Sequence, residues 1–211
     1  MKQLLFSILL LLVFTLFSFA QDSQSVKNEL STEEKEALKY MVQEEKLALD
    51  TYQLFAASFD IPVFANITQS EQRHMDAVLN LIKMHDLDDP TEGKSTGQFE
   101  NRSLQTLYDS LKNSKNDIIN ALLAGALIEE TDIKDLLDKI AMTHDENIKV
   151  VFNNLLQGSY NHIRAFTRNL QMRGVIYKPE ILDEDAYAAV IRSDRRTRGQ
   201  GRGNCKRSFN D

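Results

Sequence analysis

Acidic and histidine side chains stand at positions of this chain where the spacing calls for apolar ones. Four segments, written in alternating steps of three and four residues, follow the pattern of a helix face that packs in a core. Each face is apolar except near its middle, where the polar positions are Glu45, Glu71, His74, Glu129, Ser159 and His162. An isolated buried carboxylate costs several kcal/mol, so these acids and imidazoles need a compensating cation. A divalent metal ion would supply it.

Four of these polar positions, one from each helix, are also predicted to lie at one depth. With a rise of 1.5 Å per residue, Glu45 and Glu129 each lie about 21 to 23 Å before the turn that follows their helix. His74 and Ser159 lie at comparable distances after those turns. The spacing therefore predicts that ligands from four helices meet near the middle of a bundle.

The segment Glu71-Gln72-Arg73-His74 places an acid and an imidazole on one helical face, three residues apart. Such a pair can share metal ions, although acidic helices also carry it as a surface pair.

Two of the acids have an acidic neighbour, in Glu44-Glu45 and Glu129-Glu130, and only one residue of each pair can face the core. Steps from Glu44 lead to Thr51 and steps from Glu130 lead to Lys134, so these two acids are expected to face a wetter side. Glu45 and Glu129 are therefore predicted to face the core.

Three further residues are candidates near the site. Asp132, three residues after Glu129, is either an additional ligand or a solvent-facing acid. Tyr52, two turns after Glu45, is either a hydrogen-bond donor to a ligand carboxylate or an ordinary core tyrosine. Ser159 precedes His162 by three residues, where its hydroxyl can support the ligands without carrying charge.

The elements that position these residues are predicted to be helices. Eight glycines and three prolines leave long uninterrupted stretches, which is typical of an all-α chain. Ser31 with Glu34 forms a capping box, and Ser114 with Asp117 and Thr143 with Glu146 repeat the cap pattern. Gly174 is predicted to end the last long helix. The four long helices are expected at about 32–59, 63–86, 115–142 and 144–173.

The connections predict how these helices are joined. The first and third turns are short, whereas roughly 28 residues, with a short helix at 102–112, separate the second and third long helices. A connection of that length can travel along a bundle, as in ferritin-like four-helix bundles with one long crossover. Another short helix is expected at 183–192, which completes a single domain over residues 31–192.

The two ends of the chain carry other signals. Residues 1–20 combine Lys2, an apolar run and small residues before Gln21, which is typical of a secretory signal peptide followed by a linker at 21–30. An uncleaved membrane anchor is the alternative. We therefore expect export to the periplasm or beyond the cell. Residues 193–211 are basic and rich in Arg and Gly, so they form either a disordered solubilising tail or a segment that binds an anionic surface.

Charge and cysteine content limit the partners. The chain has a net charge of −6, which argues against nucleic acid binding by its body. Cys205 has no second cysteine in the chain to pair with, so it can form a disulfide only between chains, as in a homodimer. Stability must then come from packing rather than from internal cross-links.

Ordered motifs give the chain a family resemblance. The segments EEKLALDTY, FANITQSEQRHMDAV, GQFENRSLQTLYDSL, GALIEETDI and GSYNHIRAF resemble the prokaryotic ferritin-like family known as domain of unknown function 2202, over about residues 30–192. The resemblance implies a ferritin-like bundle with a metal centre, and no established reaction. In di-iron relatives of this superfamily the fourth helix supplies a second Glu-x-x-His, whereas Ser159 stands at the position of that glutamate here.

These observations predict an exported metal-binding protein. Carboxylate and imidazole ligands suit iron, with manganese and zinc as alternatives. The centre is expected to hold one or two ions and to oxidise Fe(II) or reduce oxygen or peroxide. The alternatives are a non-catalytic metal carrier or sequestration protein, and a helical interaction module without metal in which the acids and histidines form buried ion pairs.

Overall fold

The computed structural model describes residues 29–200, with side chains described as far as Ser193. The predicted signal peptide, most of the linker, Cys205 and the end of the basic tail lie outside the described residues. Within this range the chain is all-helical, with no strand. The elements are α1 (Thr32–Ser58), α2 (Pro62–Met84), α3 (Arg102–Leu111), the 3-10 helix η1 (Lys112–Asn116), α4 (Ile118–Met142), α5 (Glu146–Gln171) and α6 (Glu184–Gln200).

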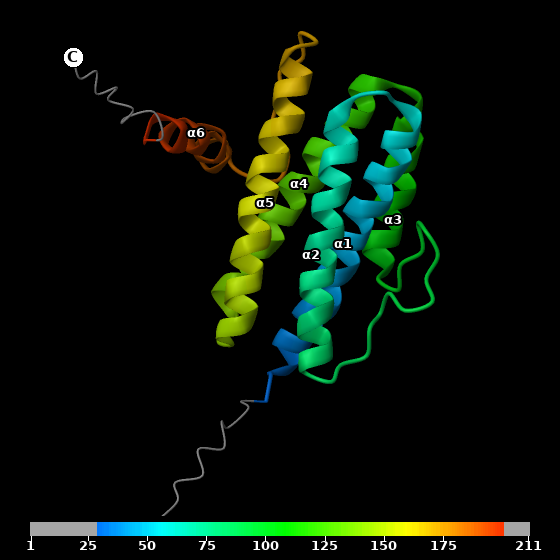
Figure 1. Ribbon diagram of the computed structural model, residues 1–211, viewed down its shortest axis with the longest axis vertical. Coiled ribbons are helices and arrows are strands. Elements are labelled where there is room, and N and C mark those ends of the chain that lie inside the picture. Colours follow the sequence, from blue (N-terminus) through cyan, green and yellow to red (C-terminus); the bar gives the residue numbers. More distant parts are fainter. Residues whose placement is uncertain (1–28, 201–211) are drawn as a thin grey trace, which may run out of the picture.

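The four long helices, α1, α2, α4 and α5, lie side by side (Figure 1). α1 packs against α2 and α4 against α5, and contacts of α2 with α5 and of α1 with α4 close the ring. The predicted long connection is present, and α3 lies within it beside α1. Because this crossover carries the chain back along the length of the helices, α4 runs in the same direction as α2 (Figure 1). Each long helix therefore presents one face to a shared interior.

The start of α1 follows the predicted capping box. The Glu34 amide donates to Ser31 Oγ at 3.1 Å, and the Ser31 amide donates to Glu34 Oε2 at 2.9 Å. The other two predicted caps are wrong. Asp117 caps α4 by accepting from the Asn120 amide, because Ser114 lies within η1.

Asp145, rather than Thr143, caps α5. Its carboxylate accepts from the amides of Asn147 and Ile148. Thr143 instead ends α4 and donates its hydroxyl to Glu34 Oε1 at 2.8 Å. α5 therefore begins at Glu146, two residues later than the cap pattern suggested.

The C-terminal part follows the predicted order of elements. Gly174 has a φ of +77°, and the Val175 amide donates to the Leu170 carbonyl, which closes the end of α5. Asp183 accepts from the Ala186 amide at the start of α6. The helix then continues to Gln200 rather than ending near 192, so the first part of the segment expected to be disordered is helical.

Polar contacts hold the crossover, the connection between α2 and α4, against α1. Gln43 Oε1 accepts from the amides of Glu100 and Asn101, each at 2.8 Å. Asp50 accepts from the Gly97 amide at 2.8 Å and pairs with Lys46. These contacts bury the outer face of α1 as well as its inner face, so residues 41–50 are all buried.

Two apolar clusters fill the interior, one toward each end of the long helices. The first includes Leu38, Met41, Val78, Leu81, Ile133, Leu136, Ile148, Phe152 and Leu155. The second includes Tyr52, Phe55, Phe64, Ile67, Leu122, Ala126, Phe166 and Leu170. The residues between them along each helix are the polar ones that interrupt the apolar spacing. No helix in the described range combines the length and the apolarity needed to cross a bilayer.

Candidate metal centre

The predicted acids, histidines and Ser159 lie in the polar layer between the two apolar clusters, and Tyr52, a member of the second cluster, reaches this layer with its hydroxyl. Seven are at most 7% exposed, and His74 is partly buried with a side chain 13% exposed. Each long helix contributes two of them: Glu45 and Tyr52 from α1, Glu71 and His74 from α2, Glu129 and Asp132 from α4, and Ser159 and His162 from α5. Polar side chains from four separate helices therefore meet in one buried layer.

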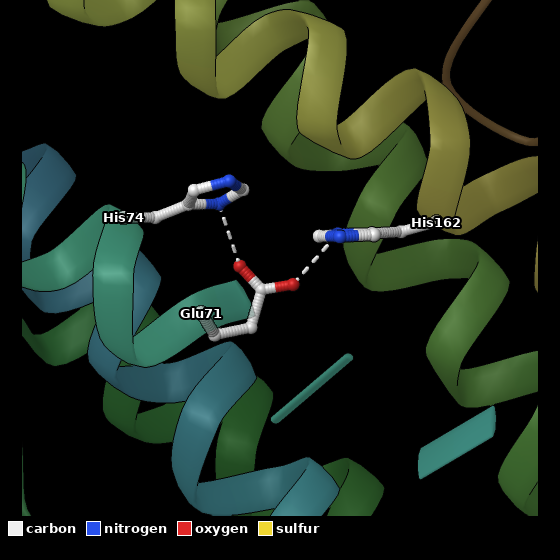
Figure 2. Close-up of side chains that lie close together, drawn as sticks. All are labelled: Glu71, His74 and His162. Atoms are coloured by element: carbon white, nitrogen blue, oxygen red, sulfur yellow. Dashed lines mark hydrogen bonds and ion pairs between the residues drawn. The ribbon is translucent and has the colours of Figure 1, made fainter. Parts of the chain in front are cut away.

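The carboxylate of Glu71 lies between the two imidazole rings (Figure 2). Its Oε2 is 2.9 Å from His74 Nδ1, and its Oε1 is 2.7 Å from His162 Nδ1. The two rings are 5.5 Å apart between centroids and inclined by 27°. Ligand atoms from Glu71, His74 and His162 all lie within 4.8 Å of one another, which is close enough for a common metal ion.

Each histidine also faces a second carboxylate. His74 Nδ1 is 3.4 Å from Glu45 Oε2, and His162 Nδ1 is 3.3 Å from Glu129 Oε2. The arrangement therefore consists of two half-sites that share Glu71. One half-site combines α1 with α2, and the other combines α4 with α5.

Several buried ligand atoms have no hydrogen-bond partner among the described residues. They are Glu45 Oε1, Glu71 Oε1, Asp132 Oδ1 and His162 Nδ1. Glu71 Oε1 and His162 Nδ1 are only 2.7 Å apart, yet they are not oriented to hydrogen-bond each other. Buried polar atoms are rarely left unpaired. Glu71 and His162, which carry two of these atoms, belong with His74 to the group whose ligand atoms lie within 4.8 Å of one another, so the residues present fit a metal ion.

The electrostatics of the layer favour a cation. Burial, followed by the charge of Asp132, raises the pKa of Glu45 well above its usual value. Burial and the charge of Glu129 raise the pKa of Asp132 to about 7. Burial would also raise the pKa of Glu71, but His162 and His74 lower it to about 2. Carboxylates outnumber imidazoles in the layer, so added positive charge is stabilising there.

Comparison with known proteins identifies the family. The family model described as "Uncharacterized protein domain (DUF2202)" matches residues 34–194. The chain belongs to the DUF2202 family. An uncharacterized protein of Methanocaldococcus jannaschii, MJ0754, is 42% identical over 169 residues, which cover 79% of this chain and 91% of that protein. The crystal structure of hypothetical protein MJ0754 matches with a TM-score of 0.74 at 41% identity, covering 76% of this chain and 93% of that one.

Within the DUF2202 domain of this chain, two hydroxyl groups contact candidate ligand carboxylates. Tyr52 on α1 donates to Glu129 Oε1 on α4 at 2.6 Å. Its partner is therefore not Glu45, the glutamate on its own helix face. The Ser159 hydroxyl lies within hydrogen-bond distance of both Asp132 Oδ2 and the Leu155 carbonyl and can donate to either of them. The α4 carboxylate of Asp132 therefore lies beside the α5 position where Ser159 stands. Asp132 is only 6% exposed and does not face solvent.

The expectation that Glu44 and Glu130 face a wetter side was wrong. Glu130 is 0% exposed, because Tyr177 and the amides of residues 180–182 cover it and donate to its carboxylate. Glu44 is 3% exposed and its Oε2 has no partner. Helical spacing cannot reveal cover from distant segments, so nothing in the local pattern indicated that either residue is buried.

Gly158 lies against the candidate site, at a position that helical spacing did not indicate. A Cβ atom at this position on α5 would lie 2.4 Å from His74 Cε1 and 2.5 Å from Nε2. No side chain fits there while His74 keeps its place. The missing Cβ leaves room for the imidazole between α2 and α5.

Proposed function

We propose that this protein is a ferritin-like four-helix bundle whose centre binds divalent metal, with iron as the preferred ion. One observation carries the proposal: the Glu71 carboxylate is shared by two histidines, and each histidine meets a second carboxylate from another helix. The proposed ligands are Glu45, Glu71, His74, Glu129, Asp132 and His162.

The arrangement of helices supports the ferritin-like part of the proposal. A ring of four long helices with one crossover along their length is the connectivity of that superfamily. The likeness to the MJ0754 crystal structure supports a fold shared within DUF2202. Carboxylate and imidazole ligands directed inward from all four helices are also the usual basis of metal sites in such bundles.

The balance of charge supports a pair of ions. Two divalent ions carry four positive charges, and Glu45, Glu71 and Glu129 carry three negative charges. Asp132 supplies the fourth, from the neighbouring helix rather than from the α5 position occupied by Ser159. Glu71 then serves both half-sites, while Glu45 with His74 and Glu129 with His162 complete them.

The chain's own residues would hold and isolate the ions. The apolar clusters exclude bulk water from both ends of the layer. Tyr52 and Ser159 fix the orientation of the Glu129 and Asp132 carboxylates. A bound redox-active ion would supply one-electron chemistry with oxygen or peroxide, and Fe(II) is the candidate substrate for oxidation.

Metal analysis of protein purified without a metal-affinity tag tests this function. We expect one or two equivalents of metal per chain, or saturable uptake when Fe(II) is added without oxygen. Glu71→Gln should weaken binding at least 100-fold, because it removes the carboxylate that both half-sites share. Asp76→Asn is the matched control, since Asp76 is an exposed acid on the same helix. Wild-type protein that neither contains nor takes up metal would refute the proposal.

Oxygen consumption separates catalysis from storage. An oxidase consumes oxygen in proportion to the Fe(II) added and continues beyond the stoichiometry of the site. A carrier or sequestration protein binds the same metal and consumes no oxygen in turnover. We propose the redox role because unpartnered ligand atoms and a water-poor layer suit it, and a binding isotherm without turnover would favour the carrier.

The ion pairs in the layer favour a second candidate function, a helical interaction module without metal. His74 pairs with Glu71 and His162 lies 3.3 Å from Glu129, so the layer has internal charge compensation. If this network is the whole role of the layer, chelators and added metal will both leave the melting temperature unchanged.

We also propose that the protein acts outside the cytoplasm, on the basis of the apolar run at residues 1–20. Mass spectrometry of protein recovered from cell fractions tests this. A mature chain beginning at Gln21 in the exported fraction is expected, and a full-length chain confined to the cytoplasm would contradict it.

A further inference from the structure

The metal layer is closed at both ends by apolar side chains, so a path to it must run between helices. Leu38, Leu136 and Phe152 lie on one side of the layer, and Phe55 and Phe166 lie on the other. Carrying a dication through either cluster would remove its hydration without replacement, at a cost of many kcal/mol. A route lined by oxygen atoms avoids that cost.

Such a lining exists where α1 faces α4. Tyr40 and Glu44 lie one turn apart on α1, and Asp132, Asp135 and Lys139 follow one another along one face of α4. Tyr40 donates to Asp135 Oδ2 at 2.8 Å, which ties the two helices together. We call these five residues the α1/α4 seam. Its inner end reaches the metal layer at Asp132, which also contacts Ser159.

Two buried oxygens in the seam have no partner among the described residues. They are Glu44 Oε2 and Asp132 Oδ1, and their side chains belong to residues that are 3% and 6% exposed. Glu44 is buried, and Asp132 and Asp135 are the acids of α4 that act on it most strongly. A buried acid placed beside other acids, with a free oxygen, is poorly explained by packing alone. A cation that passes along the seam would meet these two oxygens one after the other.

The outer end of the seam opens at the surface. A hollow of about 340 Å³ lies between the start of α1 and the end of α4, and Glu33, Glu36, Tyr40, Asp138 and Lys139 are among its lining residues. Lys139 Nζ lies 4.2 Å from the centroid of the Tyr40 ring and 3.9 Å from Asp135 Oδ1. Its ammonium group therefore sits where the acidic row meets the hollow.

We propose that Glu44, Asp132 and Asp135 form a transit site for a divalent cation, through which metal passes from this hollow to the centre, and that Lys139 restrains entry. The inference rests on the proposed metal-binding function. At 1.5 Å per residue, Glu44 lies about 12 Å along α1 from Glu36, so the route crosses about two helical turns. Each step along it offers a carboxylate oxygen, the ligand that hard divalent ions accept.

Stopped-flow binding of Co(II) tests the route, because the visible absorption of bound Co(II) reports occupancy without any reaction. Glu44→Gln keeps the shape of the side chain and removes its charge. We expect the association rate of Co(II) to fall at least tenfold. We expect its release to a chelator to slow by a similar factor, since the same barrier is crossed in both directions. Final absorbance and affinity should stay close to those of the wild type.

Two further variants keep the test independent of folding. Asp135→Asn should also slow uptake, whereas Lys139→Gln should accelerate it, because it removes the positive charge at the entrance. Because a loosened bundle would also take up metal faster, Lys139→Gln must keep the melting temperature of the wild type for its gain in rate to support the proposal. Glu92→Gln, an exposed acid in the crossover, removes the same charge away from the seam and should leave the rate unchanged.

The outcomes separate this inference from the function on which it rests. Unchanged association rates in both Glu44→Gln and Lys139→Gln would refute the transit site while leaving the metal centre intact. Weaker binding of Co(II) to Glu44→Gln with an unchanged association rate would also refute it, because Glu44 would then act on the bound ion. Failure of the wild-type protein to bind Co(II) would refute the metal centre itself.

Discussion

At the scale of single residues, the space beside His74 depends on the absence of one carbon atom. Gly158 on α5 faces the imidazole so closely that a Cβ atom would lie 2.4 Å from it. His74 has to stay there to contact both Glu45 and Glu71. The geometry of one half-site therefore rests on a residue that offers no ligand.

We predict that Gly158→Ala weakens metal binding at least tenfold by displacing the His74 ring. The unfolding free energy of the metal-free protein should change by less than about 1 kcal/mol. Alanine favours the helix over glycine by about 1 kcal/mol, and this gain offsets the cost of moving the His74 ring. Metal titration and urea unfolding measure the two effects.

Gly125→Ala is the contrasting change. Its Cβ would lie 2.7 Å from Phe166 ring carbons inside an apolar cluster. Overpacking of a core typically costs about 1–3 kcal/mol, so this variant should lose stability and keep most of its metal affinity. If both variants lost stability alone, Gly158 would have no specific role at the centre.

At the scale of elements, one carboxylate joins the starts of two helices. Glu34 Oε2 accepts from the Ser31 amide at the start of α1. Its Oε1 accepts from the Thr143 hydroxyl and from the amides of His144 and Asp145, just before α5. Burial alone would raise the pKa of Glu34, but these hydrogen bonds lower it to about 2.

This pKa predicts how stability depends on pH. Because the folded pKa lies below the usual value, Glu34 stabilises the protein above about pH 4.5, and its contribution falls as the pH drops toward about 2. We expect Glu34→Gln to lower the unfolding free energy by about 2 kcal/mol at neutral pH and by progressively less in acid. Urea unfolding across pH 2 to 7 measures the difference.

Glu33→Gln is the control, since Glu33 is an exposed acid in the same first turn. It should alter stability little at any pH. A Glu34→Gln effect that stayed constant from pH 7 to pH 2 would show that the loss is steric rather than electrostatic.

The carboxylate of Glu130 binds the segment that precedes α6. Glu130 accepts from the Tyr177 hydroxyl and from the amides of Glu180, Ile181 and Leu182. Replacement by alanine would leave these donors unpaired, which costs about 1–3 kcal/mol for each buried group. We predict that Glu130→Ala makes residues 175–183 sensitive to protease while the long helices stay folded.

Limited proteolysis with mass spectrometry locates the cleavage. Glu180→Ala is suited as a control, because the side chain of Glu180 is exposed and its amide is retained. Global unfolding of Glu130→Ala, without selective cleavage, would mean that the C-terminal segment and the bundle form one cooperative unit.

At the scale of the whole molecule, metal binding should be coupled to folding. The polar layer separates two apolar clusters, so a ligand that holds all four helices together in the layer stabilises the native state and not the unfolded chain. Free metal at 100 times its dissociation constant adds about 2.7 kcal/mol. For a chain of this size, each kcal/mol raises the melting temperature by about 2–4 °C.

We therefore predict a rise of about 5–10 °C in melting temperature on adding saturating Fe(II) without oxygen, reversed by a chelator. Calorimetry or circular dichroism measures it. Glu71→Gln should show no such rise, although it remains folded. A rise of equal size in that variant would place the bound metal elsewhere on the protein.

Much of the fold and of the candidate site could be predicted from the chain alone, because helix faces are encoded locally. Steps of three and four residues identified the buried faces, and the acids and histidines that interrupt them lie in one layer. Glycine and proline positions and the capping box located the long helices to within a few residues. Aspartates displaced the other two predicted caps, since their carboxylates lie nearer the first free amides.

The contacts between distant segments could be found only in the folded chain. Spacing on α4 could not show that residues 177–182 cover Glu130, or that Glu44 on α1 is buried against acids of α4. Nor could it show that Glu71 is shared by both histidines, or that Tyr52 reaches Glu129 across the layer. Periodicity along one helix records which side is apolar, whereas the partner of a polar atom depends on side chains brought close from tens of residues away.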